Sequence, residues 1–171
     1  MYQLPMSTHR RRRAAALRTI GVSLALAALS PLALADRDHE RDHYVVPLSP
    51  LYTQECSSCH IAFPPGMLPA QSWQRLMGNL SKHYGTDASL DAATSATLTA
   101  WLADNAGGDR RVSEPPPQDH ITRAAWFVRE HREVSAATWK LPAVKSSANC
   151  AACHPQADRG DFNEHSIRIP R

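Results

Sequence analysis

Apolar side chains at helical spacing mark a first segment, residues 73–84, and predict an α-helix there. Ser72 precedes this segment as a favourable helix-capping residue, and Gly85 follows it as a favourable helix end. His83 lies seven residues after Leu76, so the pattern places a histidine on the apolar face. The apolar positions that share this face are Trp73, Leu76, Met77, Leu80 and Tyr84.

The same spacing occurs in a second segment, residues 90–106, for which Ser89 is the predicted cap. Gly107 and Gly108 follow the segment and are expected to end its helix, because glycine favours helix termini over helix interiors. The apolar stripe of this helix consists of Leu98, Trp101 and Leu102.

A third segment, residues 123–135, has Thr122 as its predicted cap. His131 lies on its apolar stripe, although its neighbours in "REHRE" are all charged. The stripe consists of Ala124, Phe127, Val128, His131 and Val134. Together the three segments predict an all-α fold with little or no sheet.

Prolines interrupt the chain before the first of these helices. Residues 44–54 form an apolar stretch that Pro47 and Pro50 break. Residues 63–69, "FPPGMLP", are predicted to form a fixed loop and not a helix, because prolines and a glycine dominate them.

Three consecutive prolines also stand within residues 109–119 and predict a stiff, extended linker. We place the boundary between two small helical lobes at this linker. The predicted N-terminal lobe comprises residues 36–110, and the predicted C-terminal lobe comprises residues 111–171.

The first 35 residues have the three parts of a secretory signal peptide. A basic stretch, "HRRRRAAALR", precedes an apolar run over residues 19–34, and Ala33–Ala35 forms a small-x-small cleavage site. An uncleaved anchor is the alternative, but the apolar run is short for a membrane span of about 20 residues. We therefore predict export to the periplasm as a protein without a membrane span.

Export changes the charge of the chain. The full sequence has 19 Lys and Arg and 16 Asp and Glu, whereas residues 36–171 have 14 basic and 16 acidic residues. The net charge of this mature part is −2, so the basic character belongs to the signal. We do not expect a nucleic-acid-binding protein.

The four cysteines of the chain all lie in two Cys-x-x-Cys-His motifs, "CSSCH" and "CAACH". This spacing is that of a c-type haem attachment site. The two thiols add to one edge of a haem, and the histidine that follows ligates the iron. The sequence therefore predicts two covalently bound haem c groups. The motif residues are Cys56, Cys59 and His60 in the first and Cys150, Cys153 and His154 in the second.

Other uses of paired cysteines explain the pattern less well. A disulfide or a four-cysteine zinc site leaves the histidine after each pair unexplained, and a thioredoxin-like pair needs a βαβ context. Two haems would also supply an apolar core to a chain in which only 6% of residues are Phe, Trp or Tyr.

Each haem iron has a second axial position. His83 is our candidate for the first haem and His131 for the second, because each lies on an apolar helix face in a chain that must surround a haem. Competing candidates are His120, at an expected helix start, and His165, eleven residues after the second motif.

A methionine ligand is the less favoured alternative at one haem. Met67 lies only eight residues after Cys59, within the proline-rich loop, so we predict a packing role for it. Met77 is predicted to be a core residue of the first helix. His39 and His43 lie in a charged stretch, residues 36–43, that is expected to be a solvated terminus.

The segments "ECSSCHIAFPPGMLPAQSWQRLMGNLSKHYGTDASLD", "ITRAAWFVREHREV" and "NCAACHPQADRGDF" resemble those of the bacterial dihaem cytochrome c family. The resemblance covers roughly residues 51–171. It implies a soluble electron carrier with one bis-histidine haem in each of two lobes, and the matching distal histidines are His83 and His131. Met67 departs from the pattern, since a plain aliphatic residue is expected in "PPG-x-LP".

The expected function is electron transfer between redox partners. Family members resemble donors to a small oxygen-binding monohaem cytochrome or partners of a membrane cytochrome b. The alternative is a haem enzyme, peroxidase-like or oxygen-reactive, with one open or openable iron. A gas or redox sensor is a third reading, but no signalling module is present in the sequence.

Overall fold

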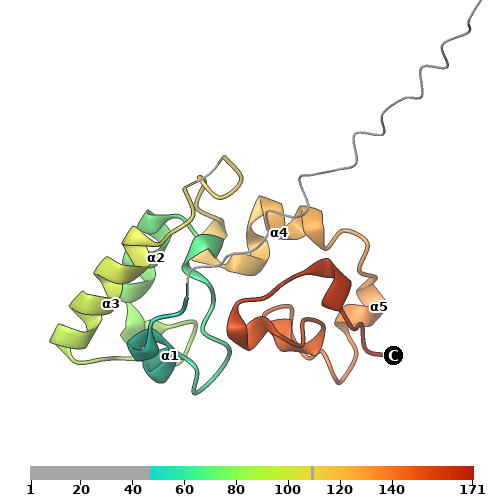
Figure 1. Cartoon of the computed structure of the whole chain (residues 1–171), viewed down its shortest axis with the longest axis horizontal. Coiled ribbons are helices and arrows are strands. Elements are labelled where there is room, and N and C mark those ends of the chain that lie inside the picture. Colours follow the sequence, from blue (N-terminus) through green and yellow to red (C-terminus); the bar gives the residue numbers. More distant parts are fainter. Residues whose placement is uncertain (1–46, 109) are drawn as a thin grey trace, which may run out of the picture. The chain divides into compact units, whose positions relative to one another are not determined.

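The computed structural model describes residues 47–108 and 110–171, which fold into short helices joined by turns (Figure 1). Within these residues there is no β-strand, and the single isolated bridge joins His83 to Thr86. The predicted all-α fold is confirmed. The α-helices are α1 (Pro50–Cys56), α2 (Ala70–Met77), α3 (Ala92–Asp104), α4 (Ala125–Glu130) and α5 (Ala136–Trp139).

Helix α1 was not expected, because two prolines interrupt the stretch that leads to it. Pro50 occupies the first turn, where a missing N–H costs nothing and the fixed φ suits a helix. The helix runs on to Cys56 and so carries the first cysteine of the first motif at its end.

Helix α2 is shorter than the predicted helix over 73–84 and begins earlier. It starts at Ala70, so Ser72 is a fully buried helix residue and not the cap. Gly78 caps its C-terminus, and the chain then tightens into a 3-10 turn, Leu80–Lys82. His83 follows this turn with φ −63° and ψ 88°, so its predicted place on a helix face is wrong.

Helix α3 confirms the second predicted helix but not its cap. The Asp91 carboxylate accepts hydrogen bonds from the backbone N–H groups of Ala93 and Thr94, so the helix starts at Ala92. The backbone N–H of Ser89 instead bonds to the side chain of Asp87 in a local turn.

The third predicted helix, 123–135, is shorter than expected, and α5 follows it as a separate helix. Thr122 lies in a 3-10 turn, Ile121–Arg123, and α4 begins after it. His131 is the first residue beyond α4. The hydroxyl of Ser135 accepts from the backbone N–H of Thr138 and caps α5, so this serine begins a helix where we expected an end.

Two hydrophobic cores hold the described residues together. In the first core, α2 packs on α3 beneath the aromatic ring of Tyr52 from α1. The second core joins Met67, from the proline-rich loop, to Val112 of the linker and to α4. Met67 is 3% exposed, as expected of a packing residue. The buried residues of the second core are Met67, Val112, Ala124, Trp126 and Phe127.

The linker is therefore packed against the loop and is more than a spacer. Gly107 lies so close to this contact that a Cβ there would stand 2.5 Å from the Gly66 carbonyl oxygen and from Val112 Cγ1. Its backbone N–H donates to the carbonyl oxygen of Leu68 at 2.9 Å. Only glycine fits this approach of two backbones.

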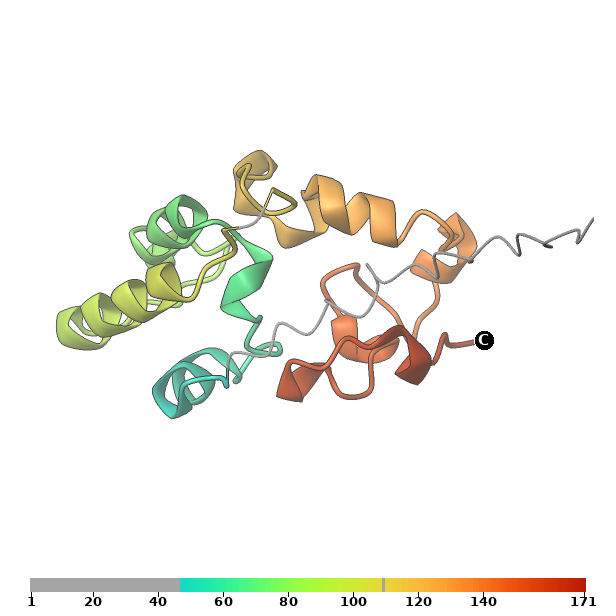
Figure 2. The ribbon, with the colours of Figure 1, turned by 45° about the horizontal axis from the view of Figure 1, so that its top comes forward.

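Residues 47–108 and 110–171 belong to one compact unit. Within it, α1, α2 and α3 gather in one group and α4, α5 and the C-terminal turns in another, as Figures 1 and 2 show. The predicted lobes, 36–110 and 111–171, are thus proposed as parts of a unit that shares the second core. The predicted signal peptide, His39 and His43 lie outside the described residues. No helix among the described residues is long and apolar enough to cross a membrane.

Candidate functional site

The first Cys-x-x-Cys-His motif brings its histidine to the imidazole of His83. The ring centroids of His60 and His83 lie 6.3 Å apart, with an angle of 27° between the ring planes. His60 follows α1, whereas His83 follows the turn after α2. Phe63 stacks on His60 with centroids 4.7 Å apart, so the loop after the motif holds the outer face of this ring.

The second motif brings its histidine to His131 in the same way. The ring centroids of His131 and His154 lie 6.2 Å apart, with an interplanar angle of 69°. His131 stacks on Phe127 at 4.0 Å, and Phe162 lies 5.2 Å from His154. All three phenylalanines of the chain thus contact the histidines of the two pairs.

The competing histidines lie elsewhere. His120 packs on the ring of Tyr84 at 4.2 Å, near the first pair and not the second. His165 is exposed on a 3-10 turn, Glu164–Ser166. Among the histidines of the described residues, His131 is the one whose ring centroid lies 6.2 Å from that of His154, close to the 6.3 Å of the first pair.

One ring of each pair is fixed by a hydrogen bond from Nδ1. The Nδ1–H of His60 donates to the carbonyl oxygen of Ile61 at 2.7 Å, and that of His131 donates to the carbonyl oxygen of Phe127 at 2.9 Å. Such a bond selects the tautomer that leaves Nε2 free as a metal ligand. The other ring of each pair is buried at Nδ1 without a hydrogen-bond partner, in His83 and in His154.

Burial favours the ligating form of these two imidazoles. The pKa of His83 is lowered by burial and by the neighbouring His60. The pKa of His154 is lowered by burial and by His131, against a smaller raising effect of Asp161. A neutral imidazole binds a metal and a protonated one does not, so both histidines are held ready to ligate.

The motif cysteines Cys56 and Cys150 are partly buried. Burial, with a smaller contribution from Glu55, raises the pKa of Cys56 to about 11, and burial raises the pKa of Cys150 to about 11. None of the four cysteines is in a disulfide. Within residues 47–108 and 110–171, no three His, Cys, Asp or Glu side chains gather as a cation site.

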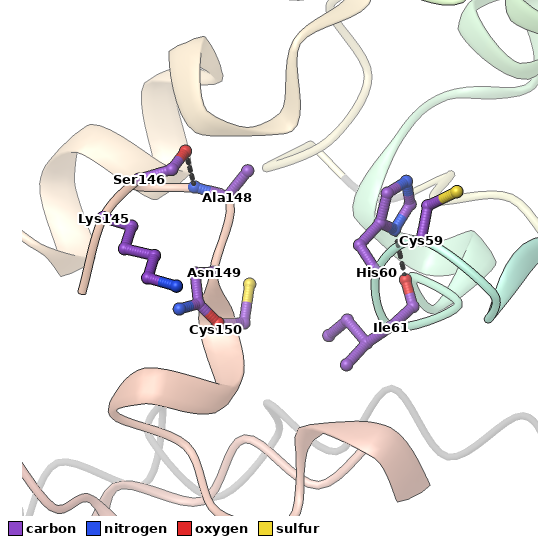
Figure 3. A pocket seen from close by; sticks show the side chains of 8 residues that line it. All are labelled: Cys59, His60, Ile61, Lys145, Ser146, Ala148, Asn149 and Cys150. Atoms are coloured by element: carbon purple, nitrogen blue, oxygen red, sulfur yellow. Dashed lines mark hydrogen bonds between the residues drawn. The ribbon is translucent and has the colours of Figure 1, made fainter. Parts of the chain in front are cut away.

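Space for large flat groups lies beside both motifs. A cavity of about 380 Å³ separates the first motif from the segment that leads to the second, and Cys59 and Cys150 line it from opposite sides (Figure 3). A second cavity of about 620 Å³ lies along α4. Val128, predicted on the buried stripe, is 59% exposed and lines this cavity. The second cavity is lined by Thr122, Phe127, Val128, His131, Arg132, Trp139, Lys145, Ser146 and Ser147.

The histidine pairs fit a shared iron. A histidine nitrogen binds a metal at about 2 Å and lies about 1 Å from its ring centre, which gives a separation of roughly 6 Å between two imidazoles on one ion. The observed 6.3 Å and 6.2 Å agree with this spacing. With a thiol pair beside each, the donor set is that of two c-type haems.

Comparison with known proteins gives the same assignment. The family model described as dihaem cytochrome c matches residues 52–162, which include both motifs. This chain belongs to the dihaem cytochrome c family. It accordingly binds two covalent haem c groups through its two Cys-x-x-Cys-His motifs. The resemblance identified from the sequence is confirmed.

Solved structures of other dihaem cytochromes are similar over most of the chain. A dihaem cytochrome c of Shewanella baltica OS155 is 36% identical, with a TM-score of 0.63 over 73% of this chain and 95% of that one. A dihaem cytochrome c of Rhodobacter sphaeroides is 41% identical, with a TM-score of 0.60 over 69% of this chain and 100% of that one. A search of curated protein sequences found no significant match.

Sequence analysis placed Phe127 on the same apolar stripe as His131 but gave it no role beside the histidine, and it missed Phe63 and Phe162. The contact between Phe127 and His131 was predictable, because residues four apart share a helix face. Phe63 follows His60 by three residues in a stretch that is not helical, so no helical spacing indicates their contact. Trp139, 5.8 Å from His131, was not predictable, because a turn outside α4 brings it there.

Proposed function

We propose that this dihaem cytochrome is a periplasmic electron-transfer protein in which both haems are bis-histidine and low-spin. The observation that carries the proposal is the spacing within two imidazole pairs, His60 with His83 and His131 with His154, whose ring centroids lie 6.3 and 6.2 Å apart. With both axial positions of each iron filled from the chain, no site remains open for a substrate. The role is therefore electron transfer and not catalysis.

Bound haem iron supplies reversible one-electron chemistry. The chain supplies the ligands and their surroundings. His60 and His131 are oriented by carbonyl acceptors, which raises the basicity of each ring toward iron. Phe63, Phe127 and Phe162 pack against the ligand rings. We expect potentials below those of a histidine/methionine cytochrome for both haems.

The partners are proposed to be other redox proteins. A small oxygen-binding monohaem cytochrome or a membrane cytochrome b would fit this role. The net charge of −2 in residues 36–171 favours a partner with a basic patch around its own haem edge. Export by the signal at residues 1–35 would place the protein where c-type haem is attached in bacteria.

Absorption and EPR spectra of the purified, oxidised protein test the proposal. Both haems should give low-spin signals, and the reduced protein should bind little carbon monoxide. A high-spin signal, or carbon monoxide binding of one full haem equivalent, would contradict bis-histidine ligation and return the open-iron enzyme to consideration.

A further inference from the structure

Tyr84, directly after the distal histidine candidate His83, has an unusual backbone. Its φ is +49°, and Gly85 follows with φ +94°. A positive φ is ordinary for glycine but uncommon for a bulky residue, and it persists only where surrounding contacts hold it. Tyr84 is 49% exposed, so burial alone does not explain why its conformation is kept.

The contacts that hold Tyr84 come from the linker, more than thirty residues later in the chain. The Tyr84 hydroxyl donates to the carbonyl oxygen of Gln118 at 3.1 Å. Its ring packs on His120 at 4.2 Å and on His83 at 4.9 Å. Tyr84 therefore lies between the linker and the histidine.

The linker is itself fixed in an uncommon conformation at this point. Gln118 and Asp119 have φ values of +53° and +57°. The guanidinium of Arg75, on α2, donates to both carboxylate oxygens of Asp119 at 2.6 and 2.9 Å. Arg123 donates to the Gln118 side chain. Three of the four non-glycine residues with positive φ in the described chain thus meet here.

The two distal histidine candidates differ in how they are held. His131 is fixed by its own helix, through the Phe127 carbonyl and the Phe127 ring. His83 follows a short turn, and its buried Nδ1 has no hydrogen-bond partner among the described residues. Its orientation toward His60 therefore depends on its backbone and on the ring beside it, which is Tyr84.

We propose that Tyr84 is a positioning residue for the distal ligand of the first haem, and that the linker holds it through Gln118, Asp119 and His120. This clamp rests on the proposed bis-histidine ligation of that haem. Through this clamp, the conformation of the linker affects how strongly His83 stays bound to the iron. His131 of the second pair is held by Phe127 and not by this clamp.

Carbon monoxide binding to the reduced protein, followed by stopped-flow, tests the clamp, because the gas must compete with the distal histidine. Tyr84→Phe removes the hydroxyl but keeps the ring, and Tyr84→Ala removes both. Loss of one hydrogen bond should raise the rate at one haem by roughly 3- to 10-fold, and loss of the ring by more. The His83→Ala protein identifies which absorbance change belongs to the first haem.

Asp119→Asn should raise the rate of carbon monoxide binding at the same haem. In the double variant with Tyr84→Phe, the Asp119→Asn change should raise this rate by less than it does alone. Thr97→Val is the matched control, because it deletes an exposed hydroxyl-to-carbonyl hydrogen bond of 2.9 Å on α3. It should leave both rates unchanged.

The outcomes separate the two proposals. If the wild-type protein already contains a high-spin haem, the bis-histidine proposal fails and the clamp with it. The wild type could be low-spin while the Tyr84→Phe and Tyr84→Ala proteins bind carbon monoxide as fast as the wild type does. In that case the clamp is wrong and the proposed function stands. An equal rise at both haems would also overturn the clamp, since it would indicate a general loosening.

Discussion

The imidazole of His131 is held twice by Phe127: the rings stack with centroids 4.0 Å apart, and the His131 Nδ1–H donates to the Phe127 carbonyl oxygen at 2.9 Å. The first contact needs the phenylalanine side chain and the second needs only the helix backbone. Phe127 also belongs to the second core, where it is 7% exposed. One residue therefore connects a proposed iron ligand to the packing of the fold.

Replacing Phe127 by alanine should lower the free energy of unfolding by about 3–5 kcal/mol, because it empties a buried site. Phe127→Leu keeps most of the apolar volume and should cost less than about 1.5 kcal/mol. Denaturant unfolding of both variants measures the difference. Equal losses would mean that packing at this position does not depend on the volume of the side chain.

Gly107→Ala should destabilise the protein by about 1–3 kcal/mol, the usual cost of overpacking. The added Cβ would stand 2.5 Å from the Gly66 carbonyl oxygen and from Val112. Gly108→Ala is the matched control, because nothing lies within 4 Å of a Cβ there. Thermal unfolding should separate the two variants by several degrees, and equal melting temperatures would contradict the close approach.

The ion pair between Arg75 and Asp119 predicts a pH dependence of stability. The Arg75 guanidinium holds the pKa of Asp119 below its usual value, so the pair stabilises the fold above the ordinary aspartate pKa of about 3.9. That contribution is lost as the pH falls through the lowered pKa. Arg75 is half exposed, which screens the effect, so we expect it to be modest.

Melting temperatures measured between about pH 6 and pH 2 should therefore fall more steeply for the wild type than for Asp119→Asn. Arg75→Gln should flatten the profile by a similar amount, and the double variant no further. Identical profiles of melting temperature against pH for the wild type and Asp119→Asn would show that this ion pair does not contribute to the acid sensitivity of the protein.

Removing one pair of cysteines should remove one covalent haem. The Cys150→Ala, Cys153→Ala double variant is expected to carry one haem equivalent by pyridine haemochrome and intact mass, against two in the wild type. Its free energy of unfolding should also fall, because the haem is part of the apolar core. Two equivalents in this variant would contradict the assignment of the second motif.

The motifs were predictable from the sequence because their chemistry is local: five consecutive residues contain the thiols and the proximal histidine. Three of the helices, α2, α3 and α4, were predictable but their extent was not, and α1 and α5 were not predicted. Gly78 ends α2 seven residues before the predicted helix end, and Asp91, not Ser89, caps α3. Helix ends are set by single side-chain and backbone contacts, which a periodic pattern does not record.

The helical pattern selected His83 because it placed this residue on a helix face, but in the structure His83 lies beyond the end of α2. It faces His60 from a turn, and Tyr84 beside it takes a conformation that no sequence signal indicates. The contact between Arg75 and Asp119 spans 44 residues. Such long-range contacts shape the site, and only the folded chain brings them together.

The most direct test of bis-histidine ligation is the EPR spectrum of the oxidised His83→Ala and His131→Ala proteins. The ligand planes differ, 27° apart in the first pair and 69° in the second, so the wild type should give two distinguishable low-spin signals. Each variant should lose one of them and gain a high-spin signal, whereas His120→Ala and His165→Ala should keep both. A His83→Ala or His131→Ala protein that stays fully low-spin would contradict the assignment of that ligand.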